Sequence, residues 1–530
     1  MRRPRLILGT VVLAVLGVAV SVSVFGAGRS SAAGGRLLLV PQQYKSIGDA
    51  VAAAKPDDFI LVGPGTYHEA ITVKTPHVTI RGVDRNAVVL DGEHKRTDGV
   101  YVDEANGVEV DNMTARNYQR NGFWWDGVTG YAGRFLTAQN SVSYGVYAFD
   151  STIGEFSDDE ASGHGDSGFY VGQCFDCKAL ITRVHSFNNS LGYSGTNAGG
   201  VVITDSEWDN NMAGIVPNTL SSEEDYPQGG KTGNTISGNN VHDNNNRTAP
   251  ATFAIGPVNP PIGIGIEIAG GWNNIVQGNR VRGEDHYGIA LHWLTTPEVG
   301  NQIRSNDVKG SGKDADLSWD GVGANNCWEG NAGASSDPPA IETTNTCAAG
   351  GLPVGGDPAS GILIALNGAG ITEPRTPTDQ PHGGAADSMP DPCAGAPSGC
   401  EQALSSSRAA PPVVVNAPVT AVKGSSYSSS PTTPSTPAST AQIVAGLQHT
   451  PTQEELATSL AAALANLQQK PIDVRVPANG QDLVGGAALA LAVLSLLLLG
   501  TAAAGWLVRR PHLSTSPSPS PSRSGDENRR

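Results

Sequence analysis

One short pattern recurs between residues 98 and 292 and limits what this chain can fold into. A glycine is followed by an apolar residue, any residue and a second apolar residue. Successive glycines up to Gly214 lie about 23 residues apart, and a later pair repeats that interval after a gap that fits about two periods plus an insertion. A fixed period of this length is typical of repeat architectures. The glycines are Gly99, Gly122, Gly145, Gly168, Gly192, Gly214, Gly265 and Gly288.

A second pattern, between the glycines, predicts short strands. An aliphatic residue is followed three positions later by a core residue and two positions after that by another, as in Ile303, Asn306 and Val308. These runs are too short, and too often broken by Gly and Asn, for helices. Asparagines recur where a sharp corner needs a residue that tolerates left-handed backbone angles. They are Asn117, Asn140, Asn188 and Asn210.

Short strands joined by such corners predict an all-β, right-handed parallel β-helix of about ten coils, each about 4.8 Å above the last. The pattern resembles the parallel β-helix repeat of the pectin lyase-like superfamily over roughly residues 37 to 332. That superfamily includes polysaccharide lyases, hydrolases, esterases and epimerases, as well as adhesins and other non-catalytic surface proteins. The resemblance therefore implies the fold and leaves the activity open.

Charge and cysteine content restrict the environment and the partners. The formal net charge of −16 argues against nucleic acid as a partner and more weakly against other anionic polymers, because an acidic surface repels phosphates and carboxylates. A local basic strip could still bind such a polymer. The six cysteines fall into three local pairs, which predict disulfides and an oxidising compartment. A zinc site built from cysteines is disfavoured, because the spacings do not form the usual doublet. The predicted pairs are Cys174 with Cys177, Cys327 with Cys347, and Cys393 with Cys400.

The two ends of the chain predict export and membrane attachment. Residues 1–33 combine early arginines, an apolar run and small residues suited to cleavage, and so predict a secretory signal, with an uncleaved anchor as the alternative. Residues 483–508 carry no charge and precede Arg509 and Arg510, which predicts a transmembrane helix. The predicted location is the plasma membrane, with the β-helix outside the cell and residues 509–530 as a cytoplasmic tail.

The segments between the two ends differ in composition. Residues 34–332 form the predicted β-helix, with a short helix within 44–54, capped by Ser46, that closes its first coil. Two insertions, at residues 220–231 and 247–261, predict loops that wall a binding groove. Residues 333–440 are rich in Gly, Ala, Pro, Ser and Thr and predict a disordered linker. Residues 441–470 predict an amphipathic helix.

An aromatic stripe is the first candidate functional feature. It lies two residues after each of four repeat glycines and stops at Ser194 and Val216. If the residue after each glycine points inward, the aromatic side chains point outward from neighbouring coils. They predict a surface that binds carbohydrate, and they also fit cross-strand packing that only stabilises a sheet. The stripe consists of Tyr101, Trp124, Tyr147 and Tyr170.

A charge ladder is the second candidate. Three successive coils offer an acidic, a basic and an acidic pair, which can simply neutralise one another on a solvated face. In the functional interpretation Arg183 binds a uronic carboxylate, while His185 and a carboxylate exchange protons with the sugar ring, as in a lyase or C5-epimerase. A hydrolase would instead use Asp158 and Asp205 as its two carboxyl groups. The ladder consists of Asp158, Glu160, Arg183, His185, Asp205 and Glu207.

Other motifs give weaker signals. Gly163-His164-Gly165-Asp166, preceded by Asp158-Asp159, is similar to words of the polygalacturonases, but the spacing is too short and that family's other elements are missing. The sequence predicts His68 and Glu69 as surface residues at a strand edge. It predicts three further histidines as turn or surface residues, with a weak metal site near the last two as the alternative; they are His242, His286 and His292. No cofactor is predicted; calcium stays open, although no calcium-binding repeat is present.

Three functions remain open at this point. The first is a membrane-anchored adhesin or surface scaffold that binds a glycan along the aromatic stripe. The second is a polysaccharide lyase or C5-epimerase that acts on uronic-acid polymers. The third is an accessory protein that helps another exported enzyme to mature. The sequence does not choose the glycan, the partner or the oligomeric state.

Overall fold

The computed structural model describes residues 35–220, 233–251, 261–349 apart from Thr295 and Ala332, and 384–419. The predicted signal (1–33), amphipathic helix (441–470), transmembrane helix (483–508) and tail (509–530) lie outside these residues, as does most of both predicted insertions. Within the described ranges, no helix is both long enough and apolar enough to cross a membrane.

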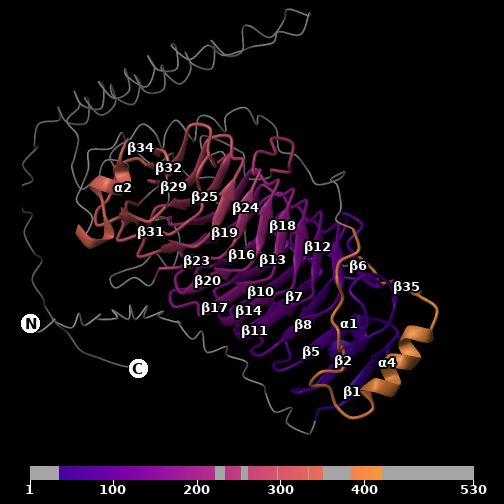
Figure 1. The fold of residues 1–530 in the computed structure, drawn as a ribbon. Coiled ribbons are helices and arrows are strands. Elements are labelled where there is room, and N and C mark those ends of the chain that lie inside the picture. Colours follow the sequence, from indigo (N-terminus) through magenta and orange to yellow (C-terminus); the bar gives the residue numbers. More distant parts are fainter. Residues whose placement is uncertain are drawn as a thin grey trace, which may run out of the picture.

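Three parallel sheets run along a rod (Figure 1). Most turns of the chain add one strand to sheet A, then one to sheet B and one to sheet C, and each strand pairs in parallel with its equivalent in the next turn. This pairing confirms the predicted parallel β-helix. Most large apolar side chains of the three sheets point inward and form one continuous core.

Sheet A contains β1 (Leu37–Val40), β2 (Phe59–Val62), β5 (Thr79–Gly82), β8 (Glu109–Asp111), β11 (Thr129–Arg134), β14 (Thr152–Ser157), β17 (Ala179–Thr182), β20 (Val201–Thr204), β23 (Thr235–Ser237), β27 (Ile275–Gln277), β31 (Gln302–Arg304) and β33 (Cys327–Glu329). Sheet B contains β3 (Gly65–His68), β6 (Val88–Asp91), β9 (Thr114–Arg116), β12 (Thr137–Gln139), β15 (Glu160–Ser162), β18 (His185–Phe187), β21 (Glu207–Asp209), β24 (Asn240–His242), β28 (Arg280–Arg282) and β35 (Val413–Asn416). Sheet C contains β4 (Ile71–Val73), β7 (Val100–Asp103), β10 (Phe123–Asp126), β13 (Val146–Phe149), β16 (Ser167–Gly172), β19 (Leu191–Thr196), β22 (Ala213–Asn218), β25 (Ile264–Ala269), β29 (Tyr287–His292), β32 (Ala315–Trp319) and β34 (Ser336–Asp337). A small fourth sheet pairs β26 (Gly271–Trp272) with β30 (Glu298–Val299).

The number of coils differs from the prediction. Sheet A has 12 strands, so the rod has about 12 turns rather than ten. The first two turns, which contain β1 and β2, precede the glycine pattern. The gap between Gly214 and Gly265 holds one turn rather than two periods, because β22 pairs directly with β25. With the inserted residues, this one turn is about as long in sequence as two repeat periods.

The corners use the residues that the sequence predicts. Asn117, Asn140, Asn188 and Asn210 all have positive φ angles, between 52° and 60°. This confirms their predicted left-handed conformation. Other asparagines are buried and form ladders along the rod: the Nδ2 group of Asn239 donates to Oδ1 of Asn279 at 3.0 Å, and each next asparagine repeats the contact. The ladder continues through Asn306 and Asn331.

The predicted helix within residues 44–54 forms as α1 (Ile47–Ala53), and Ser46 accepts a hydrogen bond from the amide of Asp49 as its cap. Its role in closing the first coil stays a prediction. Glu69 differs from its predicted surface position, because it is 3% exposed and its carboxylate accepts the amide N–H groups of Ile47 and Gly48. The positive end of the helix attracts this carboxylate away from solvent.

Part of the predicted linker is folded, so the prediction of a disordered 333–440 is wrong for the described pieces. At one end of the rod, β34, α2 (Ile341–Thr344) and the 3₁₀ turn η1 (Cys347–Ala349) extend the solenoid. Residues 384–419 lie at the opposite end, where β35 pairs with β3 and α4 (Cys400–Ala409) contacts β2 (Figure 1). Amino-acid composition did not reveal this folded segment, because a strand can pair through its backbone with few large apolar side chains.

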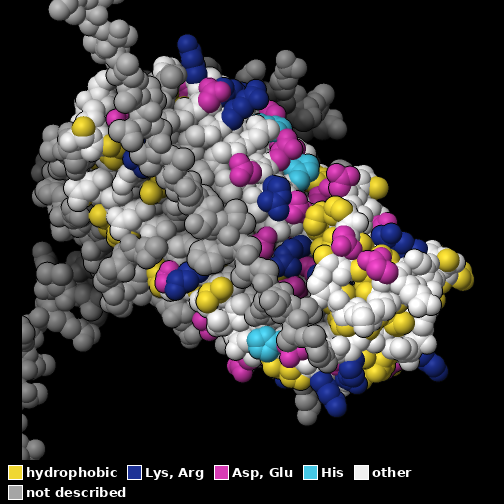
Figure 2. Space-filling view, turned by 60° about the horizontal axis from the view of Figure 1, so that its bottom comes forward, with side chains coloured by type: hydrophobic (Ala, Val, Ile, Leu, Met, Phe, Trp, Pro, Cys, Tyr) yellow, Lys and Arg dark blue, Asp and Glu magenta, His cyan; other side chains and the backbone are white. Residues whose placement is uncertain are grey.

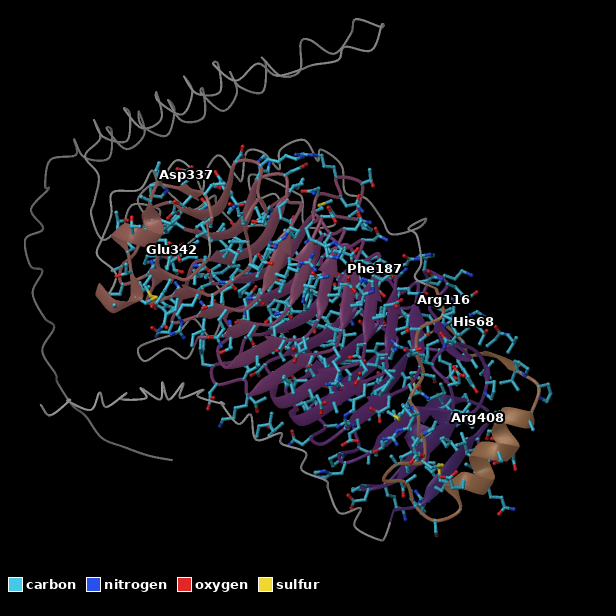
Figure 3. All side chains as sticks on the ribbon, viewed as in Figure 1. His68, Arg116, Phe187, Asp337, Glu342 and Arg408 are labelled. Carbon is cyan, nitrogen blue, oxygen red and sulfur yellow. A yellow bond between two sulfur atoms is a disulfide. The ribbon has the colours of Figure 1, made fainter. Side chains whose placement is uncertain are left out.

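The three predicted disulfides are confirmed. Cys174 bonds to Cys177, Cys327 to Cys347, and Cys393 to Cys400. The third bond holds the start of α4, and Arg408 in the last turn of this helix is labelled in Figure 3.

Candidate functional site

The aromatic stripe lies on sheet C in the predicted register. Trp124 pairs with Tyr101 on one side and with Tyr147 on the other, and Tyr147 pairs with Tyr170. The prediction that the stripe is an exposed surface is wrong. Trp124, Tyr147 and Tyr170 are all at most 5% exposed. Only Tyr101 is half-buried.

The rings pack mainly on one another. Tyr101 stacks on Trp124 with 4.2 Å between ring centroids. Tyr144, from the turn before β13, stacks on Tyr147 at 4.3 Å with the ring planes 3° apart. A sugar ring would need a free aromatic face, and these faces are occupied by neighbouring rings. The geometry therefore favours cross-strand stabilisation over the predicted carbohydrate contact.

Two carboxyl groups beside the stripe have raised pKa values. Burial raises the pKa of Asp126 to about 6, although the hydroxyl of Tyr101 donates to it at 3.0 Å and opposes the shift. Burial raises the pKa of Asp166 to about 7, again opposed by a hydrogen bond from Tyr144. This face of sheet C therefore carries less negative charge near neutral pH than its sequence suggests.

The predicted charge ladder begins at the corner between sheets A and B. Asp158, Arg183 and Asp205 follow paired strands and all have positive φ angles, of 59°, 53° and 50°. The predicted stacking is therefore confirmed. The guanidinium of Arg183 donates to both carboxylate oxygens of Asp158, at 2.9 and 2.7 Å. An exposed ion pair of this kind contributes at most about 1 kcal/mol to the stability of the fold.

His185 lies in the middle of the ladder, on β18, where Glu160 and Glu207 are its strand partners. Its Nε2 lies 2.6 Å from Oδ1 of Asp209, and its ring stacks on Phe187 at 4.5 Å. Burial lowers the pKa of His185, but the hydrogen bond and the charge of Asp209 outweigh it, so the pKa lies above its usual value. A histidine oriented by a carboxylate is suited to proton transfer.

Glu207 contacts a second histidine. Nε2 of His242 lies 3.2 Å from Oε1 of Glu207, and its Nδ1 lies 2.9 Å from Oδ2 of Asp243. Burial lowers the pKa of His242, but hydrogen bonds to Asp243 and Glu207 raise it above the usual value. Sequence reasoning gave Asp209 and His242 no role. Alternation along a strand could have found Asp209, because it lies two residues after Glu207 and so on the same face.

We call His185, Glu207, Asp209 and His242 the sheet B cluster. It is open to solvent, since the side chains of His185 and Glu207 are 38% and 49% exposed. Figure 2 shows acidic, basic and histidine side chains gathered along one side of the rod. Figure 3 places Phe187 in a row with Arg116 and His68 on sheet B. This face, rather than the aromatic stripe, offers accessible chemistry.

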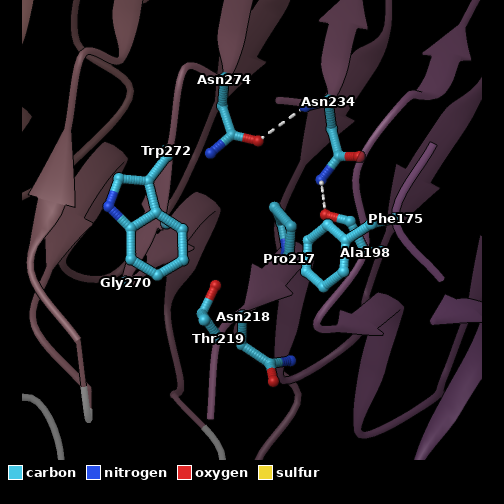
Figure 4. A pocket seen from close by; sticks show the side chains of 10 residues that line it. Phe175, Ala198, Pro217, Asn218, Thr219, Asn234, Gly270, Trp272 and Asn274 are labelled. Atoms are coloured by element: carbon cyan, nitrogen blue, oxygen red, sulfur yellow. Dashed lines mark hydrogen bonds between the residues drawn. The ribbon is translucent and has the colours of Figure 1, made fainter. Parts of the chain in front are cut away.

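A small hollow lies where the corners after sheet C lead into sheet A, next to Trp272 and Phe175 (Figure 4). Asn274 accepts the amide N–H of Asn234 at its edge. The hollow leaves about 10 Å³ for a water-sized sphere, which is room for about one water molecule. A sugar ring does not fit there.

Two buried histidines are structural. His292, predicted as a turn or surface residue, is 2% exposed and lies at the end of β29, with Nδ1 3.0 Å from Glu267 and Nε2 3.0 Å from Ser318. The order serine, histidine, carboxylate is that of a nucleophilic triad, but Ser318 is 1% exposed and out of reach of a substrate. His164, from the polygalacturonase-like word, is fully buried, and burial lowers its pKa to about 4.

No family model matches this sequence, and no curated protein matches it significantly. Solved structures similar to this chain include the A-module of a mannuronan C-5 epimerase from Azotobacter vinelandii, at 15% identity over 55% of this chain and 80% of that chain, with a TM-score of 0.44. An alginate lyase from Paenibacillus sp. str. FPU-7 has 14% identity over 54% and 97%, with a TM-score of 0.39. A pectate lyase has 12% identity over 56% and 77%, with a TM-score of 0.32. At these identities the likeness concerns the fold alone, and the parallel β-solenoid described above is the fold that the sequence predicts.

Proposed function

We propose that the protein acts on a polysaccharide that contains uronic acids, as a lyase or C5-epimerase, on the outer face of sheet B. The observation that carries this proposal is the contact between His185 and Asp209 on an open face, two residues along the chain from Arg183. Both reactions start with removal of the proton next to the uronate carboxylate. That step needs a base and a cation that neutralises the carboxylate.

Each role has a named group. Asp209 accepts the N–H of Nε2, which leaves Nδ1 of His185 as the nitrogen that takes the proton. Arg183 can exchange its exposed partner Asp158 for the uronate carboxylate, because that pair is weak. The resulting carbanion then has two fates. In a lyase it expels the glycosidic oxygen, which takes up the proton held by His185, and a double bond forms; in an epimerase it takes a proton from water on the opposite side, which inverts C5.

The hydrolase alternative gains less support. A glycosidase needs one carboxyl group that carries a proton. Both carboxylate oxygens of Asp158 accept hydrogen bonds from Arg183, so neither is directed at a substrate in this structure. The pair Asp158 and Asp205 therefore lacks an evident acid.

The test is incubation of the purified protein with alginate and with pectate. A lyase produces an unsaturated product that absorbs in the near ultraviolet, and an epimerase working in D₂O incorporates deuterium at C5 and changes the anomeric proton spectrum. We expect His185→Ala to lower either signal by about 100-fold or more. His286→Ala is the matched control, because His286 also contacts a carboxylate, that of Asp314 at 2.7 Å, but lies outside the cluster.

Two outcomes would contradict the enzymatic proposal. Saturable glycan binding without any product would favour the adhesin or scaffold alternative. Absence of glycan binding, together with co-purification of one defined exported protein, would favour the accessory alternative.

We also propose that the protein is exported and held at the plasma membrane, as residues 1–33 and 483–508 suggest. Protease added to intact cells should then release the β-helix from the membrane fraction. Recovery of the intact chain in the soluble cell fraction would contradict this.

A further inference from the structure

We propose that Glu207, Asp209 and His242 bind one divalent transition-metal ion, with zinc as the best-matched ion. Each side chain offers one ligand atom, a carboxylate oxygen or a ring nitrogen, and these three atoms lie within 4.8 Å of one another. This site goes beyond the function proposed above and does not depend on it.

The ligands project from rigid backbone. Glu207 and Asp209 lie two residues apart on β21 and therefore on the same face of the strand. His242 lies on β24 directly opposite Asp209 in the parallel pairing. A site on paired strands is held more precisely than one on loops. The three side chains need only small rotations to reach a common ion.

The spacing fits a small ion. Zinc binds histidine nitrogen and carboxylate oxygen at about 2.0 to 2.2 Å, which places neighbouring tetrahedral ligands about 3.4 Å apart. Nε2 of His242 lies 3.2 Å from Oε1 of Glu207, close to that separation.

Two further side chains orient the ligands as outer partners do in metal sites. The carboxylate of Asp243 lies 2.9 Å from Nδ1 of His242 and leaves Nε2 directed at Glu207. His185 binds Oδ1 of Asp209, which leaves Oδ2 available to the ion. His185 therefore stays outside the set of ligands.

The ligand chemistry selects the class of ion. Imidazole nitrogen suits zinc and its transition-metal neighbours. Calcium takes six to eight oxygen ligands, and this cluster offers one nitrogen and two carboxylates. Glu207 is 49% exposed, so water can complete the coordination. Without an ion, the same contacts are surface ion pairs that contribute little stability.

The test is equilibrium dialysis of the full-length protein against zinc chloride and, separately, calcium chloride, without glycan. We expect wild type to bind one more zinc ion per chain than His242→Ala does, and Glu207→Gln to weaken that site by at least about 10-fold. Asp243→Asn should weaken it by about 10-fold, because it orients His242 without binding the ion. His286→Ala is the control and should bind zinc as wild type does, since His286 and Asp314 belong to no group of three possible ligands in the part of the chain that the structure describes.

The proposal is overturned if His242→Ala keeps the same stoichiometry and affinity, or if calcium binds as tightly as zinc. Circular dichroism of each variant checks that the solenoid is intact. His185→Ala separates this site from the proposed reaction, because it should lose product formation but keep the zinc stoichiometry, with zinc affinity lowered by at most about 10-fold, as for Asp243→Asn. Cobalt loaded in place of zinc should give visible absorption in wild type that His242→Ala lacks.

Discussion

Glu69 follows a histidine in the sequence and looks like an ordinary surface acid, yet it binds the first amides of α1. Removal of this carboxylate leaves the amide N–H groups of Ile47 and Gly48 without their acceptor. We expect Glu69→Ala to lower the free energy of unfolding by about 2 to 3 kcal/mol, measured by urea denaturation. Glu342→Ala, at the other end of the rod, removes a carboxylate with one such contact and should cost less. Equal losses would contradict the assignment.

Glu284 makes stability depend on pH. Burial raises its pKa from 4.5 to about 8, against the hydrogen bonds that Asn244 donates to it. Between these values the folded state binds a proton that the unfolded chain releases, so stability falls as pH rises from about 4.5 to about 8. Glu284→Gln should remove this slope, which can reach about 1.4 kcal/mol per pH unit. Urea denaturation at pH 5 and pH 8 measures it. An unchanged slope in the variant would contradict the assignment.

At this scale the sequence predicted which residues stack and missed what they contact. The register of Arg183 with Asp158 follows from counting one repeat. The partner of His185 does not, because Asp209 lies two residues beyond the predicted ladder and reaches back diagonally across the strand pair. The burial of the aromatic stripe could not be predicted from the sequence either. It depends on Tyr144, which comes from a corner and follows no repeat.

Among the elements, the asparagine ladder is a buried side-chain link between successive coils. Asn279 is 1% exposed, donates to Asn306 and accepts from the amide and side chain of Asn239. Asn279→Ala leaves these buried groups unpaired, and we expect a loss of about 3 kcal/mol in the free energy of unfolding. Asn240→Ala, on the outer face of β24, should cost less than about 1 kcal/mol. Thermal unfolding of both variants tests the difference, and similar melting temperatures would contradict it.

Strands and corners were predictable because their signals are local. Alternation of apolar residues marks a strand, and asparagine marks a left-handed corner. The turn between Gly214 and Gly265 was miscounted because an insertion adds length without any periodic signal. β35 was missed because three valines after two prolines in a Ser- and Ala-rich stretch give no sign of their distant partner, β3.

For the whole molecule, β35 completes sheet B at the first coils. Val415 packs against the core, whereas Val414 is 68% exposed. We expect Val415→Asp to detach β35 and expose the edge of β3, which lowers the melting temperature by several degrees and promotes self-association. Val414→Asp should change neither property. Calorimetry and size-exclusion chromatography test the pair. Indistinguishable behaviour of the two variants would show that β35 contributes nothing to the fold.

The parallel β-helix as a whole was the most predictable feature, because every coil repeats the same sequence pattern. A wrong prediction for one coil therefore leaves the prediction for the next coil unchanged. Additions at its ends follow other rules. α4 and β35 belong to a segment far along the chain from the strands that they cover, and no repeat relates them.

The return of β35 to β3 has a mechanical consequence. The described chain starts just before β1 and stops just after β35, and these two strands lie at the same end of the rod (Figure 1). A force applied between these two points therefore acts only on the first coils. The rest of the solenoid carries no load. In single-molecule stretching, the first rupture should release residues 384–419 alone, and simultaneous unravelling of many coils would refute this.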